Sequence, residues 1–287
     1  MVYLLLSLRA IQPLLRYTTK TAKRMPNTTI TTLPVPEMLT TDNPTVEWLV
    51  PDFLPRQSCI LLAGEPGAGK SFLCYTLSLA LATGRPFLHC PLLPKKVCYF
   101  DQENSYPDCQ AYLQWAWHGL NCPEVGPIGS NLHFAHFQLG GPNWREVAIA
   151  HVSQSAPDLI IFDTATPCFD IGDENDNAEA TKIVATIRSL QSISNATALI
   201  LKHAKIRTDK EDGYTIRGAK AWAGAVDSVI FHIRSEGKAK LNGLRNTRLE
   251  PTKTRAFGLK STVYIRPDSV KKGLMLTGGY STSIFSC

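Results

Sequence analysis

The chain has 287 residues, enough to bury one large α/β core or a core with small appendages. Its hydrophobic fraction of 44% and charged fraction of 19% are those of an ordinary soluble globular protein. The net charge of +6 permits a polyanionic partner but does not require one. The eight cysteines are irregularly spaced and form no C-x-x-C pair, so we expect buried thiols in a reducing, cytoplasmic compartment and no zinc site.

The amino-terminal segment differs in composition from the rest of the chain. Residues 1–36 contain no Asp or Glu but carry several Lys and Arg residues. The apolar run from Val2 to Leu8 is too short to span a bilayer. An acid-poor, basic and Thr-rich segment resembles an organellar presequence, and it is equally compatible with upstream sequence ahead of a start at Met25. We expect residues 1–40 to be a disordered leader or a mis-called start.

A glycine-rich stretch follows the first predicted core strand. Residues Gly64–Ser71 fit the pattern G-x-x-x-x-G-K-[ST] of the phosphate-binding loop, between an apolar strand at 59–63 and a helix at 71–82. The glycines let successive N–H groups point at phosphate oxygens, and the helix adds its amino-terminal partial charge. Lys70 is expected at the β- and γ-phosphates and the Ser71 hydroxyl on Mg²⁺. The alternative is a glycine-rich turn that binds nothing.

The residues that we expect to contact the nucleotide are Gly64, Glu65, Pro66, Gly67, Ala68, Gly69, Lys70, Ser71 and Phe72.

The rest of the chain alternates strand and helix patterns. Strands are predicted at 96–103, 132–137, 158–163, 197–202 and 227–233. Helices are predicted at 106–117, 144–155 and 177–194. Hairpin-like segments follow around 242–243, 256–258 and Asp268. This order predicts a doubly wound, mainly parallel sheet with antiparallel strands added at the C-terminal end, formed by residues 41–270, and a strand or tail at 271–287.

Three polar residues end predicted strands, where the ligand-binding edge of a parallel sheet lies. Asp163 closes the most apolar strand and is expected to hold Mg²⁺ through water, the alternative being a cap of the next turn. Glu103 is expected to deprotonate an attacking water, with Asp101 as a competitor for that role. His203 is a candidate sensor of the γ-phosphate, and a structural histidine is the alternative.

Four stretches together resemble the RecA-like ATPases, most closely the hexameric plasmid replicative helicases of the RepA type and their AAA-labelled relatives. They are Gly64–Ser71, Tyr99–Glu103, Leu159–Asp163 and Leu201–His203, and the resemblance covers about residues 45–265. It implies ATP and Mg²⁺ as ligands and a hexameric ring of identical subunits.

The resemblance also implies roles for individual residues. Glu103 corresponds to the catalytic base, Asp163 to the strand-end aspartate and His203 to the histidine sensor. Such rings complete each site with a cation from the neighbouring subunit, and the pair Lys253 and Arg255 resembles the K-x-R pair used in this way. Arg217 is a second candidate. The chain has no separate primase-interacting domain, which questions helicase activity but not ATP hydrolysis.

Basic residues gather in residues 204–217 and 234–260. In RecA-like rings the loops after the later core strands line the central channel, so these residues are expected to track the backbone of single-stranded DNA without reading its sequence. A solvated basic surface is the alternative. We therefore expect a Mg²⁺-dependent ATPase that forms a ring or filament on single-stranded DNA. The alternatives are a small-molecule kinase and an ATP-gated regulatory or assembly protein.

Overall fold

The structure, a computed structural model, describes residues 34–40, 46–122, 125, 128–135, 143–206, 214–216, 218, 220–235, 245–255, 258–270 and 273–280. The chain divides into two compact units, Met1–Thr45 and Val46–Cys287. In the first unit the described element is helix α1 (Val35–Thr40), which has no buried residue. Among the described residues, no helix is long and apolar enough to cross a membrane.

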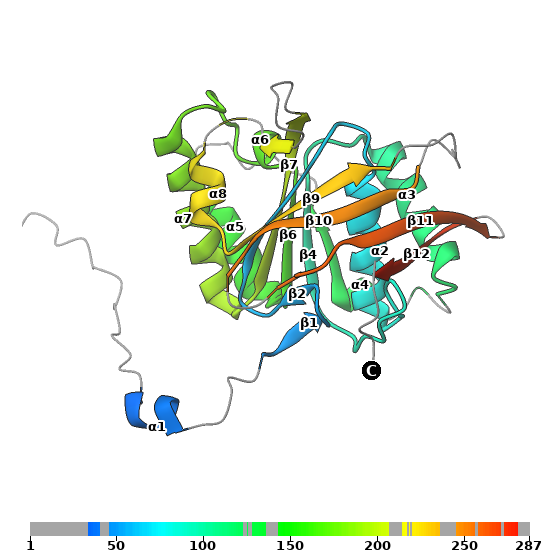
Figure 1. Ribbon diagram of the computed structural model, residues 1–287, viewed down its shortest axis with the longest axis horizontal. Helices are drawn as coiled ribbons and strands as arrows, with labels where there is room; N and C mark the ends of the chain where they lie inside the picture. Colours follow the sequence, from blue (N-terminus) through cyan, green and yellow to red (C-terminus); the bar gives the residue numbers. More distant parts are fainter. Residues whose placement is uncertain are drawn as a thin grey trace, which may run out of the picture. The chain divides into compact units, whose positions relative to one another are not determined.

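The second unit is built on a ten-stranded sheet with the order β12-β11-β10-β9-β3-β7-β6-β4-β5, and β8 pairs with β7 outside this path (Figure 1). The six strands from β9 to β5 are parallel: β3 (Cys59–Gly64), β4 (Val97–Asp101), β5 (Leu132–Ala135), β6 (Leu159–Asp163), β7 (Thr197–Ile206) and β9 (Ser228–Arg234). The antiparallel additions are β8 (Tyr214–Ile216), β10 (Thr247–Thr254), β11 (Val263–Val270) and β12 (Gly273–Tyr280). The predicted fold class is therefore confirmed.

Helices cover both faces of the sheet (Figure 1). The longer helices are α2 (Lys70–Thr83), α3 (Tyr106–Gly119), α5 (Trp144–Ser155) and α7 (Asn177–Ser194). Short helices lie at α4 (Ile128–Asn131), α6 (Ala165–Cys168) and α8 (Ala221–Ala225). Two short strands, β1 (Trp48–Val50) and β2 (Leu54–Pro55), form a separate antiparallel pair.

Two hydrophobic clusters lie on opposite faces because successive side chains of a strand point to opposite sides. Leu61 and Ile160 pack with α5 and α7, whereas their neighbours Leu62 and Ile161 pack with α2 and α3. Strands buried on both faces have almost no polar positions, which is why β3 and β6 are continuous apolar runs in the sequence. The predicted elements of this core are present with small differences at their ends.

One local prediction was wrong. The strand expected to end at Lys202 continues to Ile206, because Ala204–Ile206 pair with β8, so His203 lies inside a strand and not at its end. The predicted hairpin-like segment around Asp268 is present, since Asp268 lies in β11, which pairs antiparallel with the next strand, β12. The predicted hairpin at 242–243 lies outside the described residues, as do residues 256 and 257 of the next one.

Candidate active site

The glycine-rich loop connects the carboxyl end of β3 to the start of α2. Gly64 is opposite His232 of β9, and a Cβ on Gly64 would lie 2.5 Å from the His232 carbonyl oxygen. Only glycine therefore allows the two parallel strands to approach this closely. Gly67 and Gly69 have φ values of 68° and 93°, in the left-handed region that favours glycine. The loop thus turns the chain into α2, and the amino-terminal end of a helix is a favourable position for an anion.

Lys70 is the first residue of α2 and is buried. Its Nζ donates to the carbonyl oxygens of Gly64 and Glu65, both at 3.1 Å, so the ammonium lies inside the loop. Burial lowers the pKa of Lys70, while the carboxylates of Glu103 and Asp163 oppose that shift. The loop therefore holds a cation beside two acidic groups.

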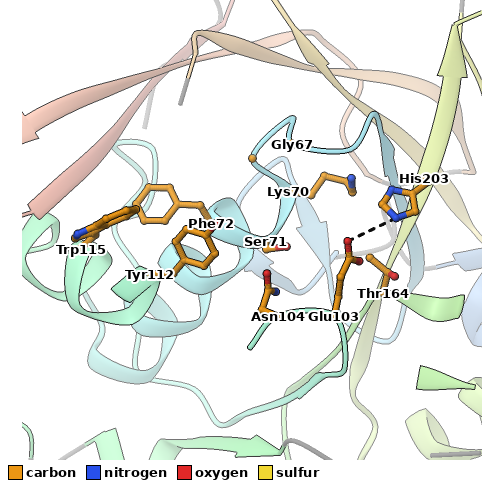
Figure 2. A pocket seen from close by; sticks show the side chains of 11 residues that line it. Gly67, Lys70, Ser71, Phe72, Glu103, Asn104, Tyr112, Trp115, Thr164 and His203 are labelled. Carbon is orange, nitrogen blue, oxygen red and sulfur yellow. Dashed lines mark ion pairs between the residues drawn. The ribbon is translucent and has the colours of Figure 1, made fainter. Parts of the chain in front are cut away.

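A cavity of about 280 Å³ opens between the loop and the carboxyl ends of the strands (Figure 2). It is lined by Gly67, Gly69, Lys70, Ser71, Phe72, Glu103, Asn104, Tyr112, Trp115, Thr164 and His203. Seven of these are among the predicted site residues. The other predicted loop residues, Gly64, Glu65, Pro66 and Ala68, belong to the same turn without lining this cavity. Segments far apart in the sequence thus meet at one site.

Glu103 and His203 face each other across the cavity (Figure 2). The Glu103 Oε1 and His203 Nε2 atoms are 3.6 Å apart. The sheet brings these two side chains together, because β4 and β7 lie on either side of β6 and all three strands run in the same direction. The carboxylate and the imidazole are therefore next to the phosphate loop and next to each other.

Asp101 occupies a different environment from Glu103. Its side chain is fully buried, and its Oδ1 accepts hydrogen bonds from the backbone N–H groups of Glu103 and Asn104 at 3.0 and 2.9 Å. Its Oδ2 accepts from the Asn104 amide at 2.9 Å and from the Tyr75 hydroxyl. Asp101 therefore shapes the turn after β4, and that turn directs Glu103 into the cavity.

Asp163 lies at the end of β6, completely buried. Its Oδ2 accepts a hydrogen bond from the Tyr99 hydroxyl at 2.6 Å. Burial and the neighbouring Asp101 raise the pKa of Asp163 to about 7, whereas hydrogen bonds from Tyr99 and Ser71 lower it. The Oδ1 atom has no hydrogen-bond partner among the described residues.

The Ser71 hydroxyl and the Asp163 carboxylate form a small set of oxygen donors beside the phosphate loop. Oxygen donors suit Mg²⁺, which keeps several waters and takes its remaining ligands from substrate phosphates. The orphan Oδ1 atom of Asp163 is a buried acceptor of the kind that a metal-bound water satisfies. These residues fit a Mg²⁺ ion that accompanies a bound polyphosphate.

The predicted trans-acting cations lie elsewhere. Lys253 pairs with Val229 near the amino-terminal end of β9, and the phosphate loop is at the other end of that strand. Its Nζ donates to the carbonyl oxygens of Ala223, Gly224 and Val226 at 2.5, 3.2 and 2.7 Å. Arg255 forms an ion pair with Asp227 at 3.1 Å. Action in a neighbouring subunit stays a prediction for both, and Arg217 lies outside the described residues.

Several residues at the site were not predicted. Thr164 directly follows Asp163 and Asn104 directly follows Glu103, and both line the cavity from the turns at the strand ends. Tyr112 and Trp115 come from α3, where their spacing of three residues places them on one helix face. That spacing could have been noticed in the sequence, since α3 directly follows the turn that contains Glu103.

Strand β9 supports the loop from its outer side. The Arg234 guanidinium donates to the Pro66 carbonyl oxygen. His232 is buried, and its Nε2 is 2.7 Å from the Thr247 hydroxyl. Burial, followed by the positive charge of Lys70, lowers the pKa of His232 to about 3, so this imidazole is neutral near pH 7. No sequence motif pointed to these contacts.

Comparison with known families agrees with this geometry. The sequence model described as "AAA domain" matches residues 26–209, a span that contains the phosphate loop, Glu103, Asp163 and His203 and ends before β9. No curated protein sequence matches the chain. Because the family model covers more than half of the chain, this protein belongs to the AAA domain family, the nucleotide-binding ATPases built around a phosphate loop.

Proposed function

We propose that this protein is a Mg²⁺-dependent, RecA-like ATPase that assembles into a ring on single-stranded DNA, in the manner of a replicative helicase. The observation that carries the hydrolytic part is the meeting of Glu103 and His203, 3.6 Å apart, in the same cavity as Lys70 and Ser71. A phosphate loop alone binds nucleotide, whereas a carboxylate that reaches the phosphates from the end of another strand supplies a base for water.

The proposed reaction is attack of water on the γ-phosphorus of ATP. The new bond joins the water oxygen to phosphorus, the bond to the β–γ bridging oxygen breaks, and Glu103 accepts the water proton. Lys70 and the loop N–H groups hold the phosphates, and Ser71 and Asp163 would hold the metal. Bound Mg²⁺ would neutralise charge that develops on the phosphate oxygens.

His203 is suited to report the state of the γ-phosphate because of its position in β7. The strand continues past the cavity to Ile206, where it pairs with β8. A shift of His203 toward or away from a phosphate would therefore reach the β7–β8 unit directly. This continuity supports a motor in which hydrolysis moves a segment outside the nucleotide site.

The support for single-stranded DNA comes from the connection between β9 and β10. Strand β9, which precedes it, ends at the same sheet edge as the phosphate loop, and residues 235–245 contain Lys238, Lys240 and Arg245 against Glu236. Such a net positive connection suits a phosphate backbone. Other basic residues of this region are bound internally, since Arg248 pairs with Glu250 at 3.1 Å and Arg255 pairs with Asp227.

The test is the steady-state ATPase rate with and without single-stranded oligodeoxythymidine. We expect the parent chain to hydrolyse ATP faster with the oligonucleotide, and Lys238→Ala/Lys240→Ala to keep its basal rate but lose the stimulation. The matched control Lys95→Ala/Lys96→Ala removes the same charge next to the start of β4 and should behave like the parent. Hydrolysis that does not respond to the oligonucleotide would refute the DNA part and favour a kinase or an ATP-gated assembly protein. No hydrolysis at all would refute the ATPase.

A further inference from the structure

The nucleotide cavity extends past Ser71 to a group of aromatic side chains. Phe72 follows Ser71 on α2, and Tyr112 and Trp115 come from α3 (Figure 2). The ring centroids are 6.2 Å apart for Phe72 and Tyr112, 6.5 Å for Phe72 and Trp115, and 5.7 Å for Tyr112 and Trp115. The cavity thus has a charged end at Lys70, Glu103 and His203 and an aromatic end.

The three rings do not stack on one another. Their planes are inclined at 58° to 67°, so they form edge-to-face contacts. Phe72 is 2% exposed and supports the other two from within, whereas Tyr112 and Trp115 are only partly buried. The inclination leaves ring surface of Tyr112 and Trp115 on the cavity wall, available to a further flat apolar group.

The charged end and the aromatic end of the cavity match the two ends of a nucleotide, which are its phosphates and its base. A polyphosphate held by Lys70 and the loop occupies the charged end, which Glu103, His203 and Thr164 close. The rest of the ligand can then extend along Ser71 and Asn104 toward Phe72 and α3 (Figure 2). A planar aromatic base at that end would cover the Tyr112 and Trp115 rings, a contact that base–aromatic stacking makes favourable.

We propose that Tyr112 and Trp115, supported by Phe72, form the subsite that binds the base of a nucleoside triphosphate. This inference rests on the proposed ATPase function, because it assumes that the phosphates lie on the loop. The aromatic end adds affinity for a nucleoside over a bare polyphosphate. It contributes nothing to binding of the phosphates themselves.

The test compares ATP with inorganic tripolyphosphate, each titrated calorimetrically in the presence of Mg²⁺. We expect Trp115→Ala to weaken ATP binding about tenfold or more, as base–aromatic stacking lost on alanine substitution does elsewhere. Its affinity for tripolyphosphate should equal that of the parent. Trp117→Ala is the matched control, because Trp117 packs on the same helix against the same hydrophobic cluster without lining the cavity. It should bind both ligands like the parent.

A second variant keeps the proposal testable if Trp115→Ala does not fold. Trp115→Phe retains an aromatic face and should bind ATP within about threefold of the parent, since stacking tolerates a change of ring. ATP should quench the tryptophan fluorescence of the parent and of Trp117→Phe, and much less that of Trp115→Phe.

Three results would overturn the base subsite: unchanged ATP affinity in Trp115→Ala, an equal loss for ATP and tripolyphosphate, or full quenching in Trp115→Phe. Failure of the proposed function looks different. A parent chain that binds neither ligand would refute the phosphate site and the base subsite together, whereas Lys70→Ala should lose both ligands while Trp115→Ala loses only one.

Discussion

Two carboxylates at the end of β4 have different environments, and the difference favours the proposal that Glu103 and not Asp101 is the base. Asp101 is buried, and its two oxygens accept hydrogen bonds from Glu103, Asn104 and Tyr75. Glu103 points into the cavity with its Oε1 3.6 Å from His203. A base must be able to contact water beside the γ-phosphate, and a fully bonded buried carboxylate cannot.

Glu103→Gln should therefore separate binding from chemistry. The amide keeps the shape of the side chain but cannot accept a proton, so ATP affinity should stay within about threefold while kcat falls by about 10²-fold or more. Calorimetry and a phosphate-release assay measure the two quantities. Asp101→Asn should instead lower the free energy of unfolding, because an amide cannot accept from all of the donors that Asp101 serves. Parent-like turnover by Glu103→Gln would move the base to another residue.

At the scale of elements, the end of α3 is packed unusually tightly against β12. A Cβ on Gly119 would lie 1.9 Å from the Leu274 carbonyl oxygen, and one on Gly273 would lie 2.5 Å from the His118 Cβ. Two glycines at one crossing let the helix backbone touch the strand backbone. This contact sets the position of α3, and so that of Tyr112 and Trp115 in the cavity.

Gly119→Ala should accordingly destabilise the protein. The added methyl group meets backbone and not a flexible side chain, so the free energy of unfolding should fall by about 1–3 kcal/mol, the usual cost of overpacking. Gly129→Ala, where a Cβ meets nothing within 4 Å, is the matched control and should change stability by less than about 0.5 kcal/mol. Urea denaturation followed by far-ultraviolet circular dichroism measures both. Equal stability of the two variants would show that β12 yields to the methyl group.

At the scale of the whole molecule, the open point is whether a neighbouring subunit completes the site. Arg255 lies near the amino-terminal ends of the parallel strands, away from the nucleotide cavity of its own chain. Its side chain is 59% exposed even with the Asp227 ion pair, so it is accessible to another subunit. Lys253 is less suitable for testing, because its ammonium is held by three carbonyl oxygens and its removal would disturb the end of α8.

Arg255→Ala should bind ATP normally but hydrolyse it at least about 10³-fold more slowly if Arg255 acts on a neighbour's phosphates. Mixed with Glu103→Gln, which is slow because it lacks the base, it should recover part of the activity. Some interfaces of a mixed ring combine an intact base with an intact arginine. Size-exclusion chromatography with light scattering, together with ATPase assays of the mixtures, measures assembly and rescue. A monomeric chain whose mixtures recover nothing would exclude the ring.

The local elements of the fold could be read from the sequence. The boundaries of α5 and α7 coincide with the predicted ones, and those of α2 and β3 differ by one residue. Helix periodicity, continuous apolar strands and the glycines around Lys70 are properties of neighbouring residues, so one segment suffices to recognise them. The phosphate loop, the strand-end acids and the fold class followed from such signals.

The tertiary structure decided what depends on sheet order and packing. The burial of Asp101 against Tyr75, the placement of His203 inside β7 opposite Glu103, and the meeting of Phe72 with Tyr112 and Trp115 all require contacts between segments tens of residues apart. The length of β7 is an example, since Ala204–Ile206 are strand only because β8 pairs with them. Local patterns contain no information about which strand lies beside which, and the hydrogen bonds and burial that assign a side chain its role arise only from that arrangement.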